Sequence, residues 1–365
     1  PAREWLISLA KNGIRLWQFL PLAPPDSEGS PYSSPSGFAL NPWLLDVDDL
    51  VEEGFLKGSI NEHLPKSIDR NEFSLDFSLA DFQTKVLKKA LREAWSYQSF
   101  NRRQEFLSWC ENQCWLDDHS TFMVLRQEHK GLPWWEWSKE LAGYNQAALK
   151  KWKEVNQELL LENNLLQWHL DRQLQALRDF AKKKNVLLFG DLPFYVSRDS
   201  ADVWSHQALF SIFPDGELES QSGVPPDYFS DTGQLWGTPV YKWSIHRESN
   251  FSWWRSRFRR QLEQFDLVRL DHFRALVSYW SVDGKDNTAM VGEWLPSPGE
   301  DLLKVLASDC DGQLPLVAED LGVITSEVED LRDKFDLSGM KVLQFAFDGD
   351  QNNTHLPENF KGKNW

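Results

Sequence analysis

Several features that would place the chain in a common protein class are missing from this 365-residue sequence. It has no run of about 18 apolar residues, which a membrane-spanning helix would need. Its three cysteines, Cys110, Cys114 and Cys310, give no disulfide framework, and Cys110 and Cys114 lack histidine partners for a zinc site. Reduced thiols predict a cytoplasmic protein, or one of the plastid stroma if the source is a plant.

Basic charge and phosphate-binding motifs are also scarce. The formal net charge is -16 at pH 7, and a surface of this sign repels nucleic acids and anionic membranes. Neither G-x-G-x-x-G nor G-x-x-x-x-G-K-[ST] is present, which disfavours nucleotide chemistry. We therefore expect neither nucleic acid nor membrane as a partner, and the sequence does not indicate an oligomeric state.

Tryptophan, by contrast, is abundant, with 19 residues. Exposed aromatic rings suit ligands with apolar C–H faces, sugars especially, although most individual tryptophans are better interpreted as core packing. The Trp-Trp-Glu-Trp cluster at residues 134–137 is interpreted as packing between subdomains rather than as a sugar platform.

Apolar segments of strand length recur along the chain, each after a helical pattern. They cover residues 14–21, 185–193, 265–270, 314–318 and 340–347. Four of them end in acidic residues, namely Asp191, Asp271, Glu319 and Asp348. The alternation predicts an α/β fold with a parallel sheet, and the acids converge only if that sheet curls into a barrel.

The strand-like segments are separated by stretches of different character. Residues 1–45 and 185–365 are predicted to be barrel parts, whereas residues 46–184 read as a helical insertion with helical periodicity at 82–95, 103–115 and 149–180. Helices are also predicted over residues 1–12 and 251–265. The Gly-rich, aromatic loop at 216–240 is predicted to be a lid over an extended ligand, with an ordinary Ω-loop as the alternative.

The segment 268–274, Val-Arg-Leu-Asp-His-Phe-Arg, concentrates charge at the end of a strand. Arg269 lies two residues before Asp271 and therefore on the same side of the strand. Its charge would keep Asp271 ionised, as a nucleophile requires. The alternative is an ordinary surface ion pair.

A second acid, Glu319, ends another apolar strand, where desolvation favours its protonated form. Two carboxylates on either side of a sugar are the minimum requirement for glycoside chemistry, and retention of configuration places them about 5–5.5 Å apart. Asp271 suits the nucleophile and Glu319 the acid/base. The alternative is two unrelated salt-bridged acids.

Four motifs in this order resemble the 4-α-glucanotransferases (amylomaltases, or disproportionating enzymes) of the α-amylase superfamily. They are Phe-Gly-Asp-Leu-Pro at 189–193, the loop at 223–237, Arg-Leu-Asp-His-Phe-Arg at 269–274, and Ala-Glu-Asp-Leu-Gly-Val-Ile at 318–324. The resemblance covers nearly the whole chain, from residues 16–21 to 341–347.

The resemblance implies a (β/α)₈ barrel with helical insertions and transfer of α-1,4-glucan segments between maltooligosaccharides by a retaining double displacement. It implies no metal or organic cofactor. Besides catalytic Asp271 and Glu319, it implies substrate contacts from several segments: Arg269 and His272 in the cleavage subsite, Asp191 and Asp320 near the donor sugar, Gln234 and Trp236 in the lid with Asp227, Tyr228 and Phe229, and Ser30 and Tyr32 in a donor-side loop.

The sequence departs from the family pattern in two ways. It has Trp-Gly-Thr-Pro at 236–239 where the family often has Trp-Gly-Asn-Pro. The first, seventh and eighth strands, and a third catalytic aspartate, would lie outside residues 1–365, so we expect the chain to be part of a larger protein. An α-glucan hydrolase and a non-catalytic glucan-binding protein remain alternatives, and starch, glycogen and maltose metabolism all remain open.

Overall fold

The structure is a computed structural model that describes residues 1–56, 76–227, 230–322 and 324–360. The chain divides into two compact units. The sheet unit comprises Pro1–Pro21, Ala181–Arg198 and His206–Trp365, and the helical unit comprises Leu22–Phe180 and Asp199–Ser205. Each unit is described by itself.

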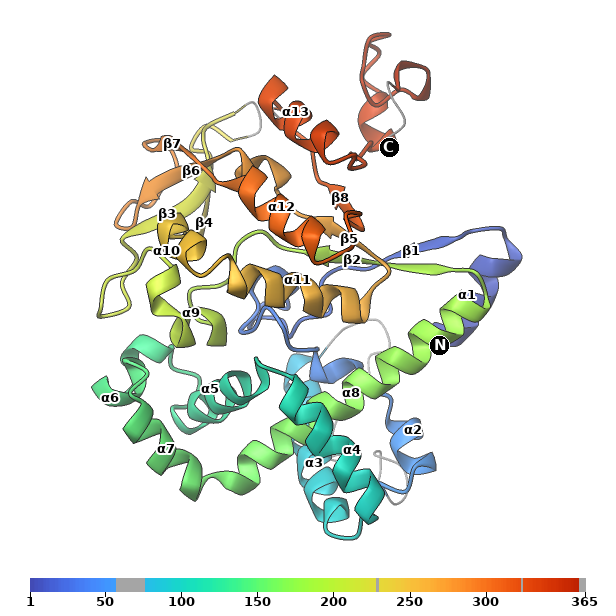
Figure 1. The fold of residues 1–365 in the computed structure, drawn as a ribbon, viewed down its shortest axis with the longest axis vertical. Coiled ribbons are helices and arrows are strands. Elements are labelled where there is room, and N and C mark those ends of the chain that lie inside the picture. The colour runs from blue at the N-terminus through green and yellow to red at the C-terminus, as the bar shows by residue number, and fades with distance from the viewer. Residues whose placement is uncertain (57–75, 228–229, 323, 361–365) are drawn as a thin grey trace. The chain divides into compact units, whose positions relative to one another are not determined.

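A parallel sheet of four strands forms the first layer of the sheet unit (Figure 1). Its order is β1 (Leu16–Gln18), β2 (Leu187–Leu192), β5 (Leu267–Leu270) and β8 (Leu316–Ala318). Neighbouring strands pair in register, with Asp191 opposite Arg269 and Leu270 opposite Ala318. Four of the predicted strand segments therefore form the predicted parallel sheet.

The central strands are apolar because they are covered on both faces. Leu188 and Val268 are fully buried, and α11 (Ser252–Gln264) packs against β2 and β5. The first strand differs from its prediction as a buried strand. It is short and mostly exposed, with Leu16 40 % accessible. The reason is its place at the edge, where the described residues pair it on one side only.

The predicted strand at 340–347 is wrong. Leu343–Ala346 is a 3₁₀ helix. In the described residues, this part of the chain pairs with the sheet at Ser338, which forms an isolated parallel bridge with Val317. Beyond Ser338 the backbone finds other acceptors. The Met340 N–H donates to Asp320, and the Val342 N–H donates to the His355 ring. Side chains thus replace the neighbouring strand that the apolar pattern predicted.

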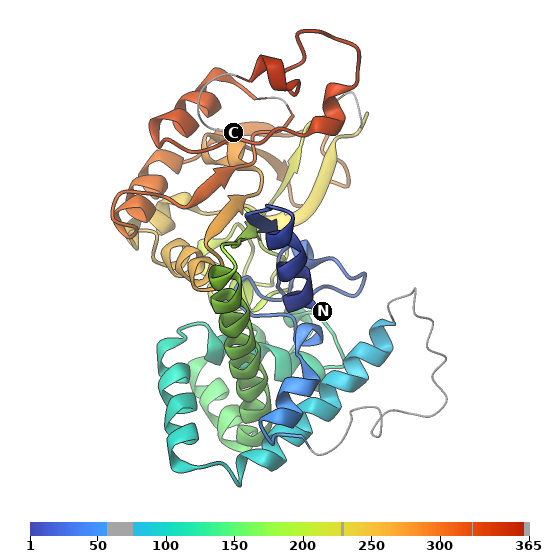
Figure 2. The same ribbon diagram turned by 90° about the vertical axis from the view of Figure 1, so that its right-hand side faces the viewer.

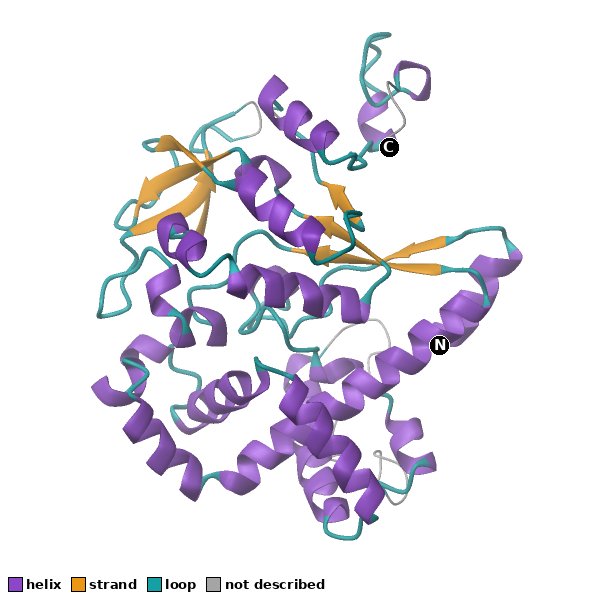
Figure 3. Cartoon of the chain, viewed as in Figure 1, coloured by secondary structure: helices purple, strands orange, loops and turns teal. Residues whose placement is uncertain are grey.

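The segment predicted as a loop at 216–240 contains two strands of a second sheet (Figure 3). This antiparallel sheet has the order β4 (Gln234–Pro239), β3 (Ser220–Val224), β6 (Ser278–Asp283) and β7 (Glu293–Pro296). Its strands are short and mix polar with aromatic residues. The pairing of β3 with β6 joins segments about 60 residues apart, with Gln221 opposite Val282.

The helices of the sheet unit follow the predicted alternation (Figure 2). The predictions over residues 1–12 and 251–265 are confirmed as α1 (Ala2–Lys11) and α11. The remaining helices are α10 (Trp243–Glu248), α12 (Gly299–Ser308) and α13 (Ser326–Lys334), with 3₁₀ turns η5 (Gln207–Leu209), η6 (Phe273–Leu276), η7 (Leu343–Ala346) and η8 (Pro357–Asn359). None of the helices in the described residues is long and apolar enough to cross a membrane.

In the described residues of the helical unit, the regular structure is helical throughout. Its α-helices are α2 (Val47–Glu52), α3 (Phe77–Trp95), α4 (Phe100–Asn112), α5 (Leu116–Glu128), α6 (Lys139–Ala142), α7 (Gln146–Val155), α8 (Gln157–Lys183, which leads into β2) and α9 (Ala201–Ser205), with 3₁₀ turns η1 (Pro31–Ser33), η2 (Pro42–Leu44) and η4 (Trp134–Glu136). The predictions at 82–95 and 103–115 match α3 and α4, and 149–180 is broken at Asn156 between α7 and α8.

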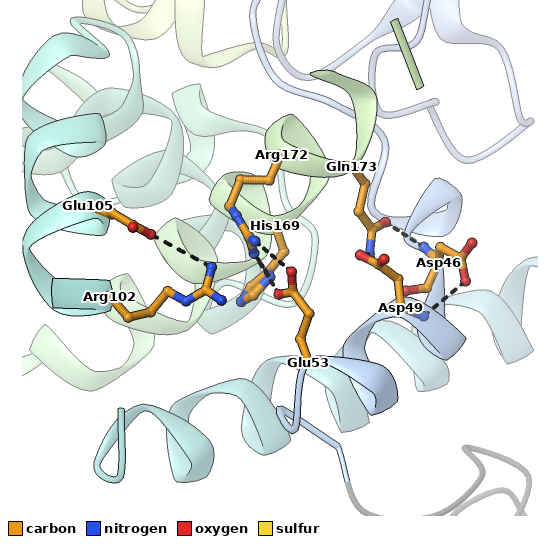
Figure 4. A network of polar contacts seen from close by, with 8 residues as sticks. All are labelled: Asp46, Asp49, Glu53, Arg102, Glu105, His169, Arg172 and Gln173. Carbon is orange, nitrogen blue, oxygen red and sulfur yellow. Dashed lines mark hydrogen bonds and ion pairs between the residues drawn. The ribbon is translucent and has the colours of Figure 1, made fainter. Parts of the chain in front are cut away.

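Polar contacts join α8 to α2 in the helical unit (Figure 4). Arg172 on α8 forms a two-pronged ion pair with Glu53, with distances of 2.7 and 2.6 Å from Nη1 and Nη2 to the two carboxylate oxygens. The side-chain amide of Gln173 accepts from the backbone N–H of Asp46, the N-cap of α2, and donates to the backbone carbonyl of Asp46. Such paired contacts fix the position of α2 against α8.

The tryptophan cluster at 134–137 packs into a core, but within the helical unit and not between subdomains as predicted. Trp134 and Trp137 are buried, and the ring of Trp137 lies 5.4 Å from that of Phe122 and 5.7 Å from that of Trp204. These partners belong to the helical unit itself, rather than to a second subdomain.

Candidate active site

Three acidic residues lie together where the parallel strands end. Asp191 belongs to the end of β2, and Asp271 and Glu319 directly follow β5 and β8. Backbone bonds join these ends, because the Asp271 N–H donates to the Leu192 carbonyl at 3.0 Å and the Glu319 N–H donates to the Leu270 carbonyl at 3.1 Å. The carboxyl ends of parallel strands meet at one edge of a sheet, which is the catalytic face of α/β folds.

Arg269 links two of these acids. Its Nη1 donates to both oxygens of Asp191, at 2.7 and 2.8 Å, and its Nη2 donates to Oδ1 of Asp271 at 2.5 Å. The Asp191 side chain is 2 % exposed and that of Asp271 30 % exposed. Asp191 is thus an internal partner of the guanidinium, whereas Asp271 keeps one side open.

Two carboxylates hold the charge of Arg269 in place. Burial opposes the charged form, but Asp271 and Asp191 outweigh it, so the pKa of Arg269 is raised. The guanidinium Nη2, 2.5 Å from Oδ1 of Asp271, forms a charge-assisted hydrogen bond that fixes the direction of this carboxylate. The predicted Arg269–Asp271 contact is therefore present, and it is part of a three-residue network rather than an isolated surface pair.

Glu319 is held by backbone amides on both of its oxygens. Its Oε2 accepts from the His272 N–H at 2.8 Å, and its Oε1 accepts from the Leu321 N–H at 3.1 Å. Burial raises the pKa of Glu319, and the negative charge of Asp271 raises it further. One acid is thus paired with a cation while its neighbour favours its proton, which is the difference that nucleophile and acid/base roles require.

His272 follows Asp271 in the chain, and its backbone N–H donates to Glu319. Its backbone is left-handed, with φ 53° and ψ 49°, a conformation that is uncommon for residues other than glycine and that clusters at functional sites. Burial lowers the pKa of His272 to about 4, so the ring is neutral at pH 7. Its buried Nε2 has no hydrogen-bond partner among the described residues, so this atom can bond a ligand.

Aromatic side chains of the sheet unit face the His272 ring. The Trp236 ring on β4 lies edge to face with it, with ring centroids 4.9 Å apart. The centroid of the Tyr195 ring lies 6.0 Å from that of Trp236 and 6.5 Å from that of His272. Gln234 accepts from the Trp236 indole N–H at 3.3 Å. Tyr195 was missed by sequence reasoning. Its only signal is its place just after the strand that ends in Asp191.

The other predicted residues are described within their own units. Ser30 and Tyr32 belong to the helical unit, at the start of η1. Asp227 accepts from the Ser230 N–H at 2.9 Å in its own turn. Tyr228 and Phe229 lie outside the described residues.

Asp320 has its own set of partners. Its side chain is 3 % exposed, and it accepts from Nη1 of Arg332 at 2.6 Å and from the Met340 N–H at 2.7 Å. Sequence reasoning also missed Arg332, which lies in a helix whose charges resemble any solvated face. Among the described residues no group of three or more His, Cys, Asp or Glu side chains is placed to hold a metal ion.

The model of the 4-alpha-glucanotransferase family, glycoside hydrolase family 77, matches residues 1–364. The chain belongs to this family. The resemblance noted in the four motifs is thereby confirmed, as is the predicted enzyme class, a glycosyltransferase that acts on α-1,4-glucans.

Curated relatives agree with this 4-alpha-glucanotransferase family assignment. The chain is 42 % identical over 365 residues to a 4-alpha-glucanotransferase of Synechocystis, covering all of this chain and 72 % of the relative. It is 40 % identical over 360 residues to that of Thermus thermophilus, covering 98 % of this chain and 71 % of the relative. An Arabidopsis thaliana relative, 37 % identical over 98 % of this chain and 61 % of its own, is named chloroplastic/amyloplastic. The location of this family member stays a prediction.

A solved structure shares the fold. Amylomaltase from Streptococcus agalactiae in complex with acarbose matches with a TM-score of 0.92 and 31 % identity, over 99 % of this chain and 72 % of that one. The mixed α/β architecture is therefore that of an amylomaltase.

Proposed function

We propose that this 4-alpha-glucanotransferase transfers glucan segments by a retaining double displacement, with Asp271 as nucleophile and Glu319 as acid/base. The observation that carries the proposal is that one of two neighbouring acids is bonded to a guanidinium, whereas the other is buried and has a raised pKa. Asp271 is bonded to Arg269 at 2.5 Å, whereas burial and the charge of Asp271 raise the pKa of Glu319. These are the states that the first step needs.

In the first step Asp271 attacks the anomeric carbon, and Glu319 gives its proton to the leaving glycosidic oxygen. A covalent glycosyl-enzyme forms, and the glucan fragment that carries the protonated oxygen leaves the site. In the second step Glu319, now ionised, takes the proton of an incoming sugar hydroxyl, which attacks the same carbon and releases Asp271. The anomeric configuration is inverted twice and so retained.

Arg269 serves as a holder of the nucleophile, and Asp191 in turn holds Arg269. A cation fixed by two carboxylates keeps its direction, so it orients the free oxygen of Asp271 without reorganisation. Asp191, placed near the donor sugar by resemblance, would contact sugar at most by its edge, because its side chain is 2 % exposed.

His272 and Trp236 are proposed as sugar contacts of the cleavage subsite. The buried Nε2 of His272 is available for a hydroxyl, and the exposed face of Trp236 suits the C–H face of a ring. With Gln234 they form the rim contributed by the β3–β4 hairpin, which would limit the access of water to the glycosyl-enzyme. Ser30, Tyr32, Asp227, Tyr228 and Phe229 are proposed to contact further glucose units of an α-1,4-glucan.

The parallel sheet is proposed to be part of a (β/α)₈ barrel in which residues 46–184 are an insertion. Both edges of the sheet support this. Leu16 of the edge strand β1 is 40 % exposed, and Ser338 forms an isolated parallel bridge with Val317 of β8 at the other edge. Catalytic residues at the carboxyl ends of the strands are the rule for such barrels.

The product profile on maltotriose tests the proposal. The natural protein is expected to release glucose and to build longer maltooligosaccharides, with no net gain in reducing ends, because each bond broken is replaced by a new one. Chromatography of the products and a reducing-end assay give both quantities. A rise in reducing ends without elongated products would identify a hydrolase. Glucan binding without any products would identify a binding protein.

A further inference from the structure

Asp320 follows the proposed acid/base in the chain, and its contacts do not favour binding of the donor sugar. Its carboxylate is buried, with Arg332 of α13 at 2.6 Å on Oδ2 and the Met340 N–H at 2.7 Å on Oδ1 (Figure 1 shows α13 and the segment that follows it beside the end of β8). Each oxygen therefore already has a charged or backbone donor. A sugar hydroxyl would have to compete with both.

The segment that meets Asp320 is built for a close approach. A Cβ placed on Gly339 would lie 2.4 Å from Oδ2 and 2.9 Å from Cγ of Asp320. No other residue fits without moving the carboxylate. The glycine thus allows residues 338–340 to come within hydrogen-bond distance of Asp320 and to bridge to Val317 of β8.

The position of Glu319 depends on the same stretch of backbone. Its carboxylate is held by the His272 and Leu321 amides, and its carbonyl accepts from the Phe273 N–H at 3.2 Å. Leu321 lies on the far side of Asp320 in the chain. If the Asp320 anchor moves, the Leu321 N–H moves with it, and one of the two bonds that orient Glu319 is disturbed.

We infer that Asp320 is a positioning residue, not a sugar contact: through Arg332 and residues 338–340 it fixes the loop that carries Glu319. This inference rests on the proposed acid/base role of Glu319. Acid/base catalysis contributes about 10²–10⁴-fold to a rate, and a misplacement of about 1 Å costs up to about 10²-fold. Loss of the anchor should therefore act on the chemical steps.

The first test replaces Arg332, which lies on α13 and lets Asp320 itself stay unchanged. Arg332→Gln is expected to lower kcat on maltotriose about 10-fold, with KM changed less than about 2-fold, because substrate contacts remain while proton transfer suffers. Arg332→Lys keeps the charge and should recover part of the rate. The matched control is Asp333→Asn. It removes the second, exposed partner of Arg332, at 2.7 Å, and should leave kcat unchanged.

A substrate that needs no acid separates positioning of Glu319 from other defects. With α-maltosyl fluoride, Asp271 forms the C–O bond while the C–F bond breaks, and fluoride leaves as an anion without a proton. Single-turnover fluoride release by Arg332→Gln should then be within about 3-fold of wild type, although the maltotriose rate falls about 10-fold. An equal loss on both substrates would overturn the inference, as would an unchanged kcat in a folded Arg332→Gln variant.

Folding is checked on each variant by circular dichroism and thermal unfolding. If Arg332→Gln does not fold, Gly339→Ala takes its place, because it presses a methyl group on the Asp320 carboxylate and removes no polar group. Gly339→Ala is expected to lower the maltotriose rate more than the rate of fluoride release. Equal effects on the two rates would reject the inference. Glu319→Gln tells the two proposals apart. Full activity in that variant would sink the acid/base assignment, whereas an inactive Glu319→Gln beside a wild-type-like Arg332→Gln would sink positioning alone.

Discussion

The two sheets of the sheet unit have the same number of strands but divide the work of the site. The parallel sheet has buried strands that end in Asp191, Asp271 and Glu319. The antiparallel sheet contributes Trp236 and Gln234 from a half-exposed hairpin. Charged groups stand on the buried parallel layer, and aromatic contacts stand on an antiparallel strand that is partly exposed. Precise bond-making needs the first, and enclosure of a long ligand needs the second.

The largest difference between the sheets should appear when an acid at a strand end is removed. Asp271→Ala is expected to lower kcat/KM on maltotriose by about 10⁴-fold or more, because no covalent intermediate can form. Glu319→Gln should cost about 10²–10⁴-fold. Asp283→Ala, at the end of β6 in the antiparallel sheet, serves as the control, and initial rates should stay near wild type. A near-normal Asp271→Ala rate would reject the assignment.

A smaller contrast is expected in stability. Leu188 of β2 is fully buried, and Leu188→Ala should lower the free energy of unfolding by about 2–5 kcal/mol, because it removes apolar contacts and leaves a cavity. Leu235 of β4 is only half-buried, so Leu235→Ala should cost about 1 kcal/mol. Urea unfolding measures both. Equal losses would show that the hairpin is packed as firmly as the parallel strands.

The next smaller effect is expected in the ratio of hydrolysis to transfer, which reports how often water replaces a sugar as the acceptor. Trp236→Ala should raise the ratio of hydrolysis to transfer about 2- to 10-fold, the equivalent of one aromatic contact of about 0.5–1.5 kcal/mol. Trp294→Ala is a matched control in β7 of the same sheet. Trp294 is 38 % exposed against 37 % for Trp236, but it packs on Trp280 and Arg274 rather than on His272. The same shift in both variants would argue against a specific role for Trp236.

The smallest effect concerns pH. Since burial and Asp271 raise the pKa of Glu319, the proton that the first step uses is retained to higher pH than the ordinary value of 4.5 allows. The transfer rate should fall as pH rises through that raised pKa. Asp271→Asn removes the second cause, so carboxyl ¹³C NMR should find the Glu319 pKa lower in that variant than in the wild type. An increase would contradict the coupling.

Much of the parallel layer was predictable because its physics is local. An apolar run that ends in an acid, such as the one before Asp271, predicts a covered strand and a functional end without reference to any partner. The helices that precede these strands were equally readable from their periodicity. The ranges 1–12 and 251–265 matched α1 and α11 within a residue or two at each end.

The antiparallel layer was not predictable in the same way. Its strands are four to six residues long, carry serine, glutamine and glycine among the aromatics, and gain their stability from partners far along the chain, as where Ser222 pairs with Ser281. The error at 340–347 is the converse. Met340 and Val342 look like strand residues, but side chains of Asp320 and His355 accept their N–H groups.

By itself the sequence determined the order of helices and parallel strands, the family, and which acids end those strands, because hydrophobic period and strand-end chemistry are local properties. The tertiary structure decided what each acid touches. Asp191 became the partner of Arg269, Asp320 became the partner of Arg332, and Glu319 acquired its raised pKa. Hydrogen-bond partners and burial depend on residues brought together from distant segments, and no local pattern encodes them.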